Sequence, residues 1–217
     1  MNKFKAFSLA VFISCVATFA SANTIITNPG PGSLFGTTAN TTFGYDFTVG
    51  SSALELTALG IWDLQQNGLT ESHTVSVWDT SGNLLATAVI SAGTINPLVG
   101  EFRYATISPI ILSAGTTYVL GATYIDHTLD PFVRNVSGDQ ATFDPAVSAG
   151  NARTKTGGGF GFPDNTSEGA GSEVGPNAQF RLANGVPDPG STALLLGLGI
   201  GCLIYAHRCV TAQTARR

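Results

Sequence analysis

Short runs in which hydrophobic and polar positions alternate dominate the middle of the chain. Hydrophobic residues occupy every second position in 43–49 and again in 118–124. This period of two is typical of strands that bury one face. The pattern predicts strands over seven segments, 43–49, 53–62, 73–79, 83–90, 101–107, 116–124 and 177–183, with two shorter ones near 132–136 and 141–143.

The spacing of these runs indicates the fold class. They recur every ten to fifteen residues, turn residues separate them, and no long run has helical spacing. We therefore expect residues 23–185 to form an all-β domain, an antiparallel β-sandwich or jelly roll. The similar stretches LGIWD (59–63) and VSVWD (75–79) suggest neighbouring strands of one sheet.

Residues 125–176 have a different composition, rich in Gly, Asp, Asn and Ser. They predict long loops at one end of the domain. Loops of this length within a compact domain are usually functional or mobile.

Charge and cysteine content narrow the possible partners and cofactors. Residues 23–186 contain thirteen acidic and five basic side chains, a net charge of −8 before histidine. Such an acidic surface argues against nucleic acid and anionic membrane as partners. The cysteines are Cys15, Cys202 and Cys209, so the predicted domain has neither a disulfide nor a Cys-ligated zinc site.

The N-terminus has the features of an export signal. Lys3 and Lys5 precede an apolar run over 6–20, which ends in the small residues Ala20 and Ala22 around Ser21. This order predicts a Sec-type signal peptide over 1–22, with cleavage after Ala22. An uncleaved anchor is the alternative, and a lipoprotein signal is disfavoured because the apolar run continues past its cysteine.

The C-terminus carries a second apolar run over 193–206, ALLLGLGIGCLIYA. A helix over 191–206 would rise about 24 Å, against a hydrocarbon core of about 30 Å, so we expect a short membrane span there. Arg208, Arg216 and Arg217 follow it and place the end of the chain in the cytoplasm. A buried core helix, the alternative, would need neither this one-sided charge nor so many glycines.

A proline-bracketed acid precedes the apolar run, at Val186, Pro187, Asp188 and Pro189, followed by Gly190, Ser191 and Thr192. The prolines favour an extended segment that is accessible to a protease. With the Leu/Gly-rich run and terminal arginines, this motif resembles the PEP-CTERM sorting signal of Gram-negative bacteria. The resemblance covers residues 186–217. It departs from the usual pattern in having Asp188 where Glu is commonest and Gly190 before the Ser-Thr pair. A GPI signal fits less well, because such a tail ends in apolar residues.

The resemblance implies a route for the protein. It implies export, transient retention in the inner membrane, and recognition by an exosortase-type protease thought to cut at the motif. Residues 59–124 also resemble the β-sandwich ectodomain found in many exported proteins with such tails. That second resemblance supports the fold and implies no enzymatic activity.

Aromatic side chains are the candidates for ligand contact. If Ile61 and Val77 face the core, Trp62 and Trp78 point to the other side of their sheets, where aromatic rings can stack on sugars. Phe160 and Phe162 in the glycine-rich stretch 156–164 are further candidates for sugar contacts. The alternative is that each Trp packs under a loop.

Metal and catalytic sites have weaker support. Four acids in the loop-rich stretch suit calcium: Asp126, Asp130, Asp139 and Asp144. There is no EF-hand-type loop, so solvated loop acids are the alternative and no other cofactor is predicted. No Gly-x-Ser-x-Gly motif is present, and His73 and His127 are predicted to lie at the surface or in turns. Paired carboxylates for glycoside hydrolysis remain open, among Asp63, Glu71, Asp79, Glu101, Asp126 and Asp130.

Together these observations predict an exported protein of the envelope or cell surface, without enzymatic activity. Its role would be structural or adhesive, in association with extracellular polysaccharide, with which the sorting family is linked. A carbohydrate-binding module, calcium dependent or not, is the alternative, and a secreted glycoside hydrolase is the third hypothesis.

Overall fold

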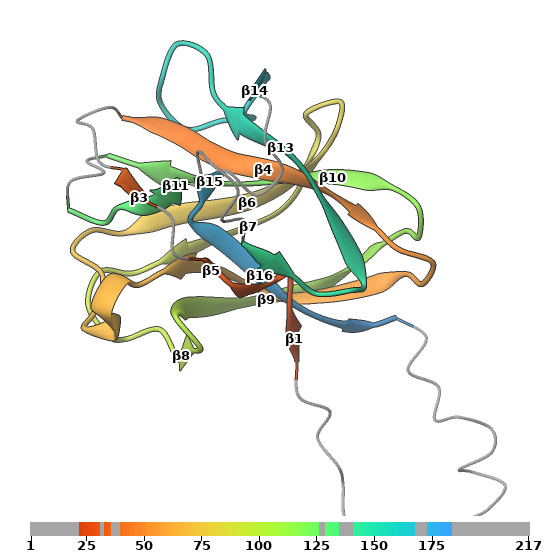
Figure 1. Ribbon diagram of the computed structural model, residues 1–217, viewed down its shortest axis with the longest axis horizontal. Coiled ribbons are helices and arrows are strands. Elements are labelled where there is room, and N and C mark those ends of the chain that lie inside the picture. Colours follow the sequence, from red (N-terminus) through yellow and green to blue (C-terminus); the bar gives the residue numbers. More distant parts are fainter. Residues whose placement is uncertain are drawn as a thin grey trace, which may run out of the picture.

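The computed structural model describes residues 22–30, 33–35, 40–125, 129–134, 141–167 and 173–183. Two large antiparallel sheets lie one over the other (Figure 1). One has five strands in the order β1-β16-β5-β9-β8, and the other has six in the order β14-β13-β4-β10-β6-β7. Two small sheets, β15-β11-β3 and β12-β2, complete the fold.

The strands of the five-stranded sheet are β1 (Asn23–Thr24), β5 (Leu54–Trp62), β8 (Leu98–Val99), β9 (Phe102–Leu112) and β16 (Pro176–Leu182). Those of the six-stranded sheet are β4 (Thr41–Val49), β6 (His73–Asp79), β7 (Leu84–Ile90), β10 (Thr117–Tyr124), β13 (Val147–Thr154) and β14 (Asn165–Ser167). The small sheets contain β2 (Ile26–Asn28), β3 (Ser33–Phe35), β11 (Phe132–Arg134), β12 (Thr142–Phe143) and β15 (Glu173–Val174).

All seven segments that the alternating pattern predicts are strands, so the all-β, antiparallel class is confirmed. The long strand β13 lies instead in the stretch predicted as loops. Its sequence, VSAGNART, has no hydrophobic alternation, and its pairing with β4 shifts register between Ala149 and Ala152. A bulged strand of small and polar residues carries little signal of period two.

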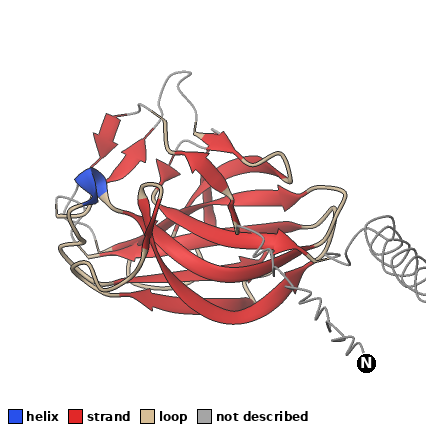
Figure 2. Ribbon diagram, turned by 90° about the horizontal axis from the view of Figure 1, so that it is seen from below, coloured by secondary structure: helices blue, strands red, loops and turns tan. Residues whose placement is uncertain are grey.

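The described residues contain one helix, the single turn η1 (Leu64–Gln66), coloured blue in Figure 2. Within the same ranges no helix is long and apolar enough to cross a membrane. The predicted signal peptide before Ala22, the sorting motif at 186–189 and the span at 191–206 lie outside the described residues.

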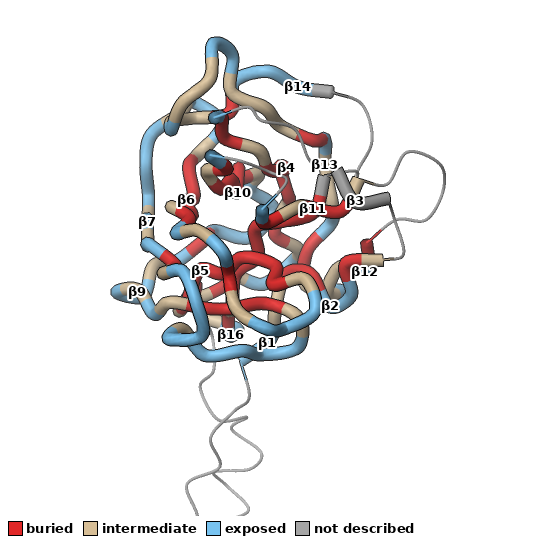
Figure 3. Tube along the Cα trace, turned by 90° about the vertical axis from the view of Figure 1, so that its left-hand side faces the viewer, coloured by how far each residue is buried: buried red, intermediate tan, exposed pale blue. Residues whose placement is uncertain are grey.

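Hydrophobic side chains from both large sheets meet in one core, red in Figure 3. From the six-stranded sheet the alternate residues Tyr45 and Phe47 point inward, and from the five-stranded sheet Leu54 and Leu56 do so. The period of two seen in the sequence therefore corresponds to the buried faces of the strands.

The similar stretches LGIWD and VSVWD are not neighbours in one sheet, and that prediction is wrong. Residues 59–62 belong to β5 in the five-stranded sheet, whereas residues 75–79 belong to β6 in the six-stranded sheet. Both strands cover the same core from opposite sides, so each needs the same hydrophobic spacing. Similar patterns therefore report a shared core and not adjacency.

A buried ion pair fixes the loops at one end of the core. Arg103 donates from Nε to Asp63 Oδ2 at 2.6 Å, and both side chains are almost fully buried. Arg103 also donates to the carbonyl oxygens of Thr94 and Asn96, while the Asp63 carboxylate accepts the N–H of Gly68. One pair of charges thus holds the turn after β5 and the connection before β8.

Asn177 links β16 to the short strand β2. Its buried amide accepts the N–H of Ile26 and donates to the carbonyl of Ile26, each at 2.9 Å. The side chain thereby pairs with the backbone of β2 as a neighbouring strand would. This contact joins residues 151 positions apart in the sequence.

Candidate functional site

An aromatic cluster lies on the outer face of the six-stranded sheet. Val77 points into the core, so Trp78 points away from it, as expected. Trp78 is nevertheless buried, because Phe160 and Phe162 pack against it with ring centroids 6.0 and 6.2 Å away. Of these three rings Phe160 is the accessible one, with 47% of the residue exposed.

A glycine-rich loop holds the two phenylalanines over the sheet. Gly157, Gly158 and Gly159 have φ values of 79°, 75° and 71°, a left-handed backbone that side chains disfavour. The buried hydroxyl of Thr42 fastens the loop, since it donates to the carbonyl of Gly159 and accepts the N–H of Gly161. The stretch 156–164 is thus an anchored cap on Trp78.

Trp62 takes no part in this cluster. It lies at the end of β5, is buried within the core, and donates from Nε1 to Glu101 Oε2 at 3.0 Å. Ile61 and Trp62 are successive residues of β5 and both are buried, so both faces of the strand are covered at its end and Trp62 is not exposed. Neither tryptophan presents an exposed ring for stacking, whereas Phe160 is partly exposed beside Trp78.

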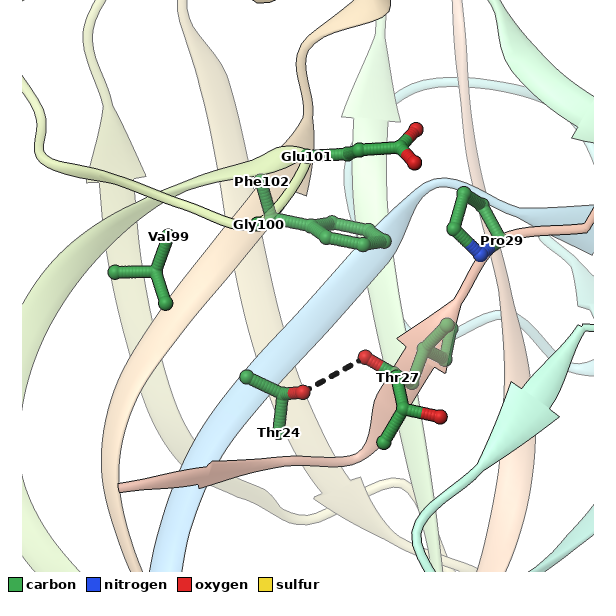
Figure 4. A pocket seen from close by; sticks show the side chains of 8 residues that line it. Thr24, Thr27, Pro29, Val99, Gly100, Glu101 and Phe102 are labelled. Atoms are coloured by element: carbon green, nitrogen blue, oxygen red, sulfur yellow. Dashed lines mark hydrogen bonds between the residues drawn. The ribbon is translucent and has the colours of Figure 1, made fainter. Parts of the chain in front are cut away.

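A small pocket lies next to Glu101, between the first strands and the β8–β9 turn. Figure 4 shows Thr24, Thr27 and Pro29 on one side and Glu101 and Phe102 on the other. Its volume is about 140 Å³, below the roughly 300–1,000 Å³ usual for small-molecule sites. Its one carboxylate already accepts the Trp62 indole N–H, so this pocket lacks the features of a catalytic site.

His73 and Asp130 form a buried pair beside Tyr124. The sequence predicted a surface histidine, and this is wrong, because His73 is fully buried with its ring 5.1 Å from that of Tyr124. Nδ1 of His73 lies 2.7 Å from the carbonyl oxygen of Thr123, and Nε2 lies 3.0 Å from Asp130 Oδ2. Each ring nitrogen of His73 therefore lies within hydrogen-bond distance of an acceptor oxygen.

Asp130 is held in its ionised form. Its oxygens accept the backbone N–H groups of Thr70 and Glu71 at 2.8–2.9 Å. Burial raises the pKa of Asp130, but the bonds from His73 and the two N–H groups outweigh burial and leave the pKa below its usual value. The pair thus joins β6, the loop that precedes it and the segment before β11, a structural role.

Of the four predicted calcium ligands, the structure describes Asp130 and Asp144. Asp126 and Asp139 lie outside the described residues. Asp144 accepts the N–H of Ala146 in a turn and shares no bonding partner with Asp130. Over the described ranges, no group of three His, Cys, Asp or Glu side chains could hold a metal ion.

Each acid considered for glycoside hydrolysis that the structure describes has a structural contact. Asp63 pairs with Arg103, Glu101 accepts the N–H of Trp62, and Glu71 accepts the N–H of Ile125. The turn after β6 places Asp79 against Asn83 and the backbone of Ser81 and Gly82, and these contacts, the Asn83 side chain first, lower the pKa of Asp79. These contacts favour a structural role for the acids.

A larger concave surface lies between β7 and β9, which the sequence did not indicate as a site. This groove has a volume of about 490 Å³ and a lining of apolar and hydroxyl side chains: Leu85, Thr87, Val89, Thr106, Ile107 and Ile110. It contains no charged residue. One signal could have revealed it, since residues 80–100 contain no charged side chain.

The protein is all-β, and the buried charged side chains in the described residues hold its turns and strands together. Residues 28–171, 144 of the 217, match the family described as a domain of unknown function, DUF4082. The chain belongs to this family. No curated protein matches the chain.

Proposed function

We propose that the chain is an exported protein of the envelope or cell surface with a structural or adhesive role and no enzymatic activity. The two stacked sheets would form a β-sandwich of jelly-roll type that an N-terminal signal peptide exports. The C-terminal segment at 186–217 would retain it in the inner membrane until an exosortase-type protease cuts at Val186–Pro189.

One observation carries the non-catalytic part of this proposal. Buried ionisable side chains are the usual material of active sites, but here their bonds run to structural partners. Asp63 pairs with Arg103, Asp46 with Arg153 and Asp130 with His73, and each pair joins segments far apart in the sequence. Such an arrangement supports a durable scaffold that acts through its surface.

The intact mass of the protein from its native envelope and medium tests the sorting. Processing at both ends predicts a mass that corresponds to Asn23 through about Pro187. A chain from Asn23 to Arg217 would contradict the sorting proposal and indicate a permanent anchor. The double variant P187A/P189A should retain the tail, whereas Pro145→Ala, in an exposed turn, should be processed like the wild type.

A carbohydrate-binding role is the second candidate, and the exposed ring of Phe160 favours it. An exposed aromatic ring on an anchored loop is a suitable platform for a sugar face. Retention on immobilised extracellular polysaccharide should fall for Phe160→Ala and stay unchanged for Leu182→Ala, a comparably exposed side chain on β16. Equal retention of all three proteins would exclude Phe160 as the contact.

A further inference from the structure

β7 and the facing part of β9 form a flank of the protein without charge. No charged residue occurs between Asp79 and Glu101, or between Arg103 and Asp126. The first interval contains β7 and the second contains β9 from Tyr104 onward. β7 and this part of β9 therefore carry no charge, in a chain whose net charge is −4.

β7 is also an edge strand, since its one neighbour in the sheet is β6. The N–H of Thr74 donates to Thr123 Oγ1 and the carbonyl of Thr74 accepts from the same hydroxyl, so both groups face β10. Successive residues of a strand direct their N–H and C=O groups to opposite sides, so the N–H and C=O of Val75 and Val77 face β7. The register of the two strands makes Ala88 and Ala86 their partners. The N–H and C=O of Thr87 and Val89 then face away from the sheet.

The side chains of this edge are apolar and open to solvent. Leu84 is 52% exposed and Val89 58% exposed, and Figure 3 shows much of β7 in the exposed colour. Edge strands are normally protected by Lys, Pro or a bulge. The free edge of β9 has Pro109 and a shift of register between Leu56 and Ala58 of its partner β5. β7 has neither Lys nor Pro, and its register shift lies at Leu85, so that Ala86 to Ile90 pair with β6 without irregularity.

We propose that β7 pairs with β7 of a second copy of this chain, antiparallel, about a two-fold axis at Thr87. This register places Leu85 opposite the second copy's Val89, Thr87 opposite its own equivalent, and Ala86 opposite Ala88. The outward N–H and C=O groups of Thr87 and Val89 then find partners across the axis. The six-stranded sheet continues through both copies, and the added strand covers the groove along β9.

A second copy fits this edge better than other partners do. Two acidic molecules can approach here because neither brings a charge to the contact, whereas a basic peptide would find no attraction. An axis at Ala88 would set Thr87 opposite Val89, whereas the axis at Thr87 pairs aliphatic with aliphatic and Thr with Thr, which stabilise sheets better. The inference rests on β6, β7 and β9 alone and goes beyond the proposed function, because it holds whether or not the tail is processed.

Sedimentation velocity of the full chain in one non-ionic detergent, over about 1–100 μM, tests the pairing. The wild type should show a concentration-dependent dimer. Val89→Lys places a charge opposite Leu85 and should weaken the dimer at least about tenfold, since an apolar pair is lost at both ends of the contact. The double variant L85E/V89K should restore it, because each lysine then faces a glutamate of the second copy.

Controls separate this result from misfolding and from association through other surfaces. Ile111→Lys introduces the same charge at a residue that is also 58% exposed, outside the groove, and should leave the dimer intact. Near-ultraviolet circular dichroism should match for all four chains, which also share the same apolar ends. A monomeric wild type, equal weakening by I111K, or failure of L85E/V89K to restore the dimer would overturn the proposal.

Discussion

Removal of the Arg103 side chain should cost more stability than removal of any exposed charge. Arg103→Met keeps much of the side-chain volume and leaves the Asp63 carboxylate buried without its cation. The Asp63 side chain is almost fully buried, and apart from Arg103 its carboxylate accepts one described hydrogen-bond donor, the N–H of Gly68. The carbonyl oxygens of Thr94 and Asn96 lose their donor as well.

The expected loss follows from this burial. Breaking a buried ion pair from one side costs about 3–5 kcal/mol, because the remaining charge is left uncompensated. For a domain of this size each kcal/mol lowers the melting temperature by about 2–4 °C, so we expect a fall of about 6–20 °C. Urea unfolding and calorimetry of wild type and variant measure it.

The matched control is Arg181→Met, which breaks the ion pair with Glu55 at 2.7 Å, close to the 2.6 Å of the buried pair, but at an arginine side chain that is 58% exposed. Solvent screens such a pair, so its loss should change stability little. The variant D63N/R103M should recover part of the loss, since the buried charge is then gone. Equal stability of R103M and R181M, or no recovery in the double variant, would refute the reasoning from burial.

Three further predictions concern buried polar contacts and close packing. Because the fold lowers the pKa of Asp130, the ionised carboxylate stabilises the fold above the ordinary carboxyl range, and this stabilisation is lost as pH falls through the lowered pKa. The melting temperature, measured over about pH 2–7, should therefore fall less steeply in acid for Asp130→Asn than for the wild type. Parallel profiles of the two proteins would contradict this. Asn177→Asp turns the donor to the Ile26 carbonyl into an acceptor and should cost about 1–3 kcal/mol in urea unfolding, whereas an unchanged midpoint would show that this bond is dispensable. A Cβ on residue 44 would overlap the Leu120 carbonyl oxygen, so Gly44→Ala should destabilise by about 1–3 kcal/mol or more. It is measured beside Gly93→Ala, whose added Cβ meets nothing within 4 Å, so that its cost is limited to the backbone strain of a side chain at φ 80°, about 1–2 kcal/mol.

Much of the fold could be predicted because each long strand carries its own pattern. The alternation in 43–49 and 118–124 reflects one buried face, and the same physics produced all seven predicted strands. β13 could not be found this way, because residues such as Gly150 and Asn151 stand at its bulge and give no hydrophobic signal. Which strands are neighbours also could not be read, as the separation of β5 from β6 shows, since pairing depends on contacts far apart in the sequence.

The candidate sites were harder to predict because burial of a polar or aromatic residue depends on what covers it. Trp78 faces outward as its strand pattern predicts, but a loop about 80 residues later in the chain covers it with Phe162 and leaves Phe160 accessible. His73 gave no sign of burial, since its partner Asp130 is 57 positions away. Of the aromatic residues predicted to contact sugars, the exposed one therefore lies on the loop that covers Trp78.

Charged side chains pair where they hold distant segments together and are absent from the edge at β7. Acidic side chains such as Asp46, Asp63 and Asp130 hold distant segments together, and they are placed where the fold needs donors or acceptors. Between β7 and β9 the fold needs none, because apolar and hydroxyl side chains already pack the strands. Selection for solubility alone would favour a charged residue on such an edge. The uncharged edge at β7 is therefore better explained by a contact that charge would disrupt, and the structural role proposed above would have a direct use for such a contact between copies.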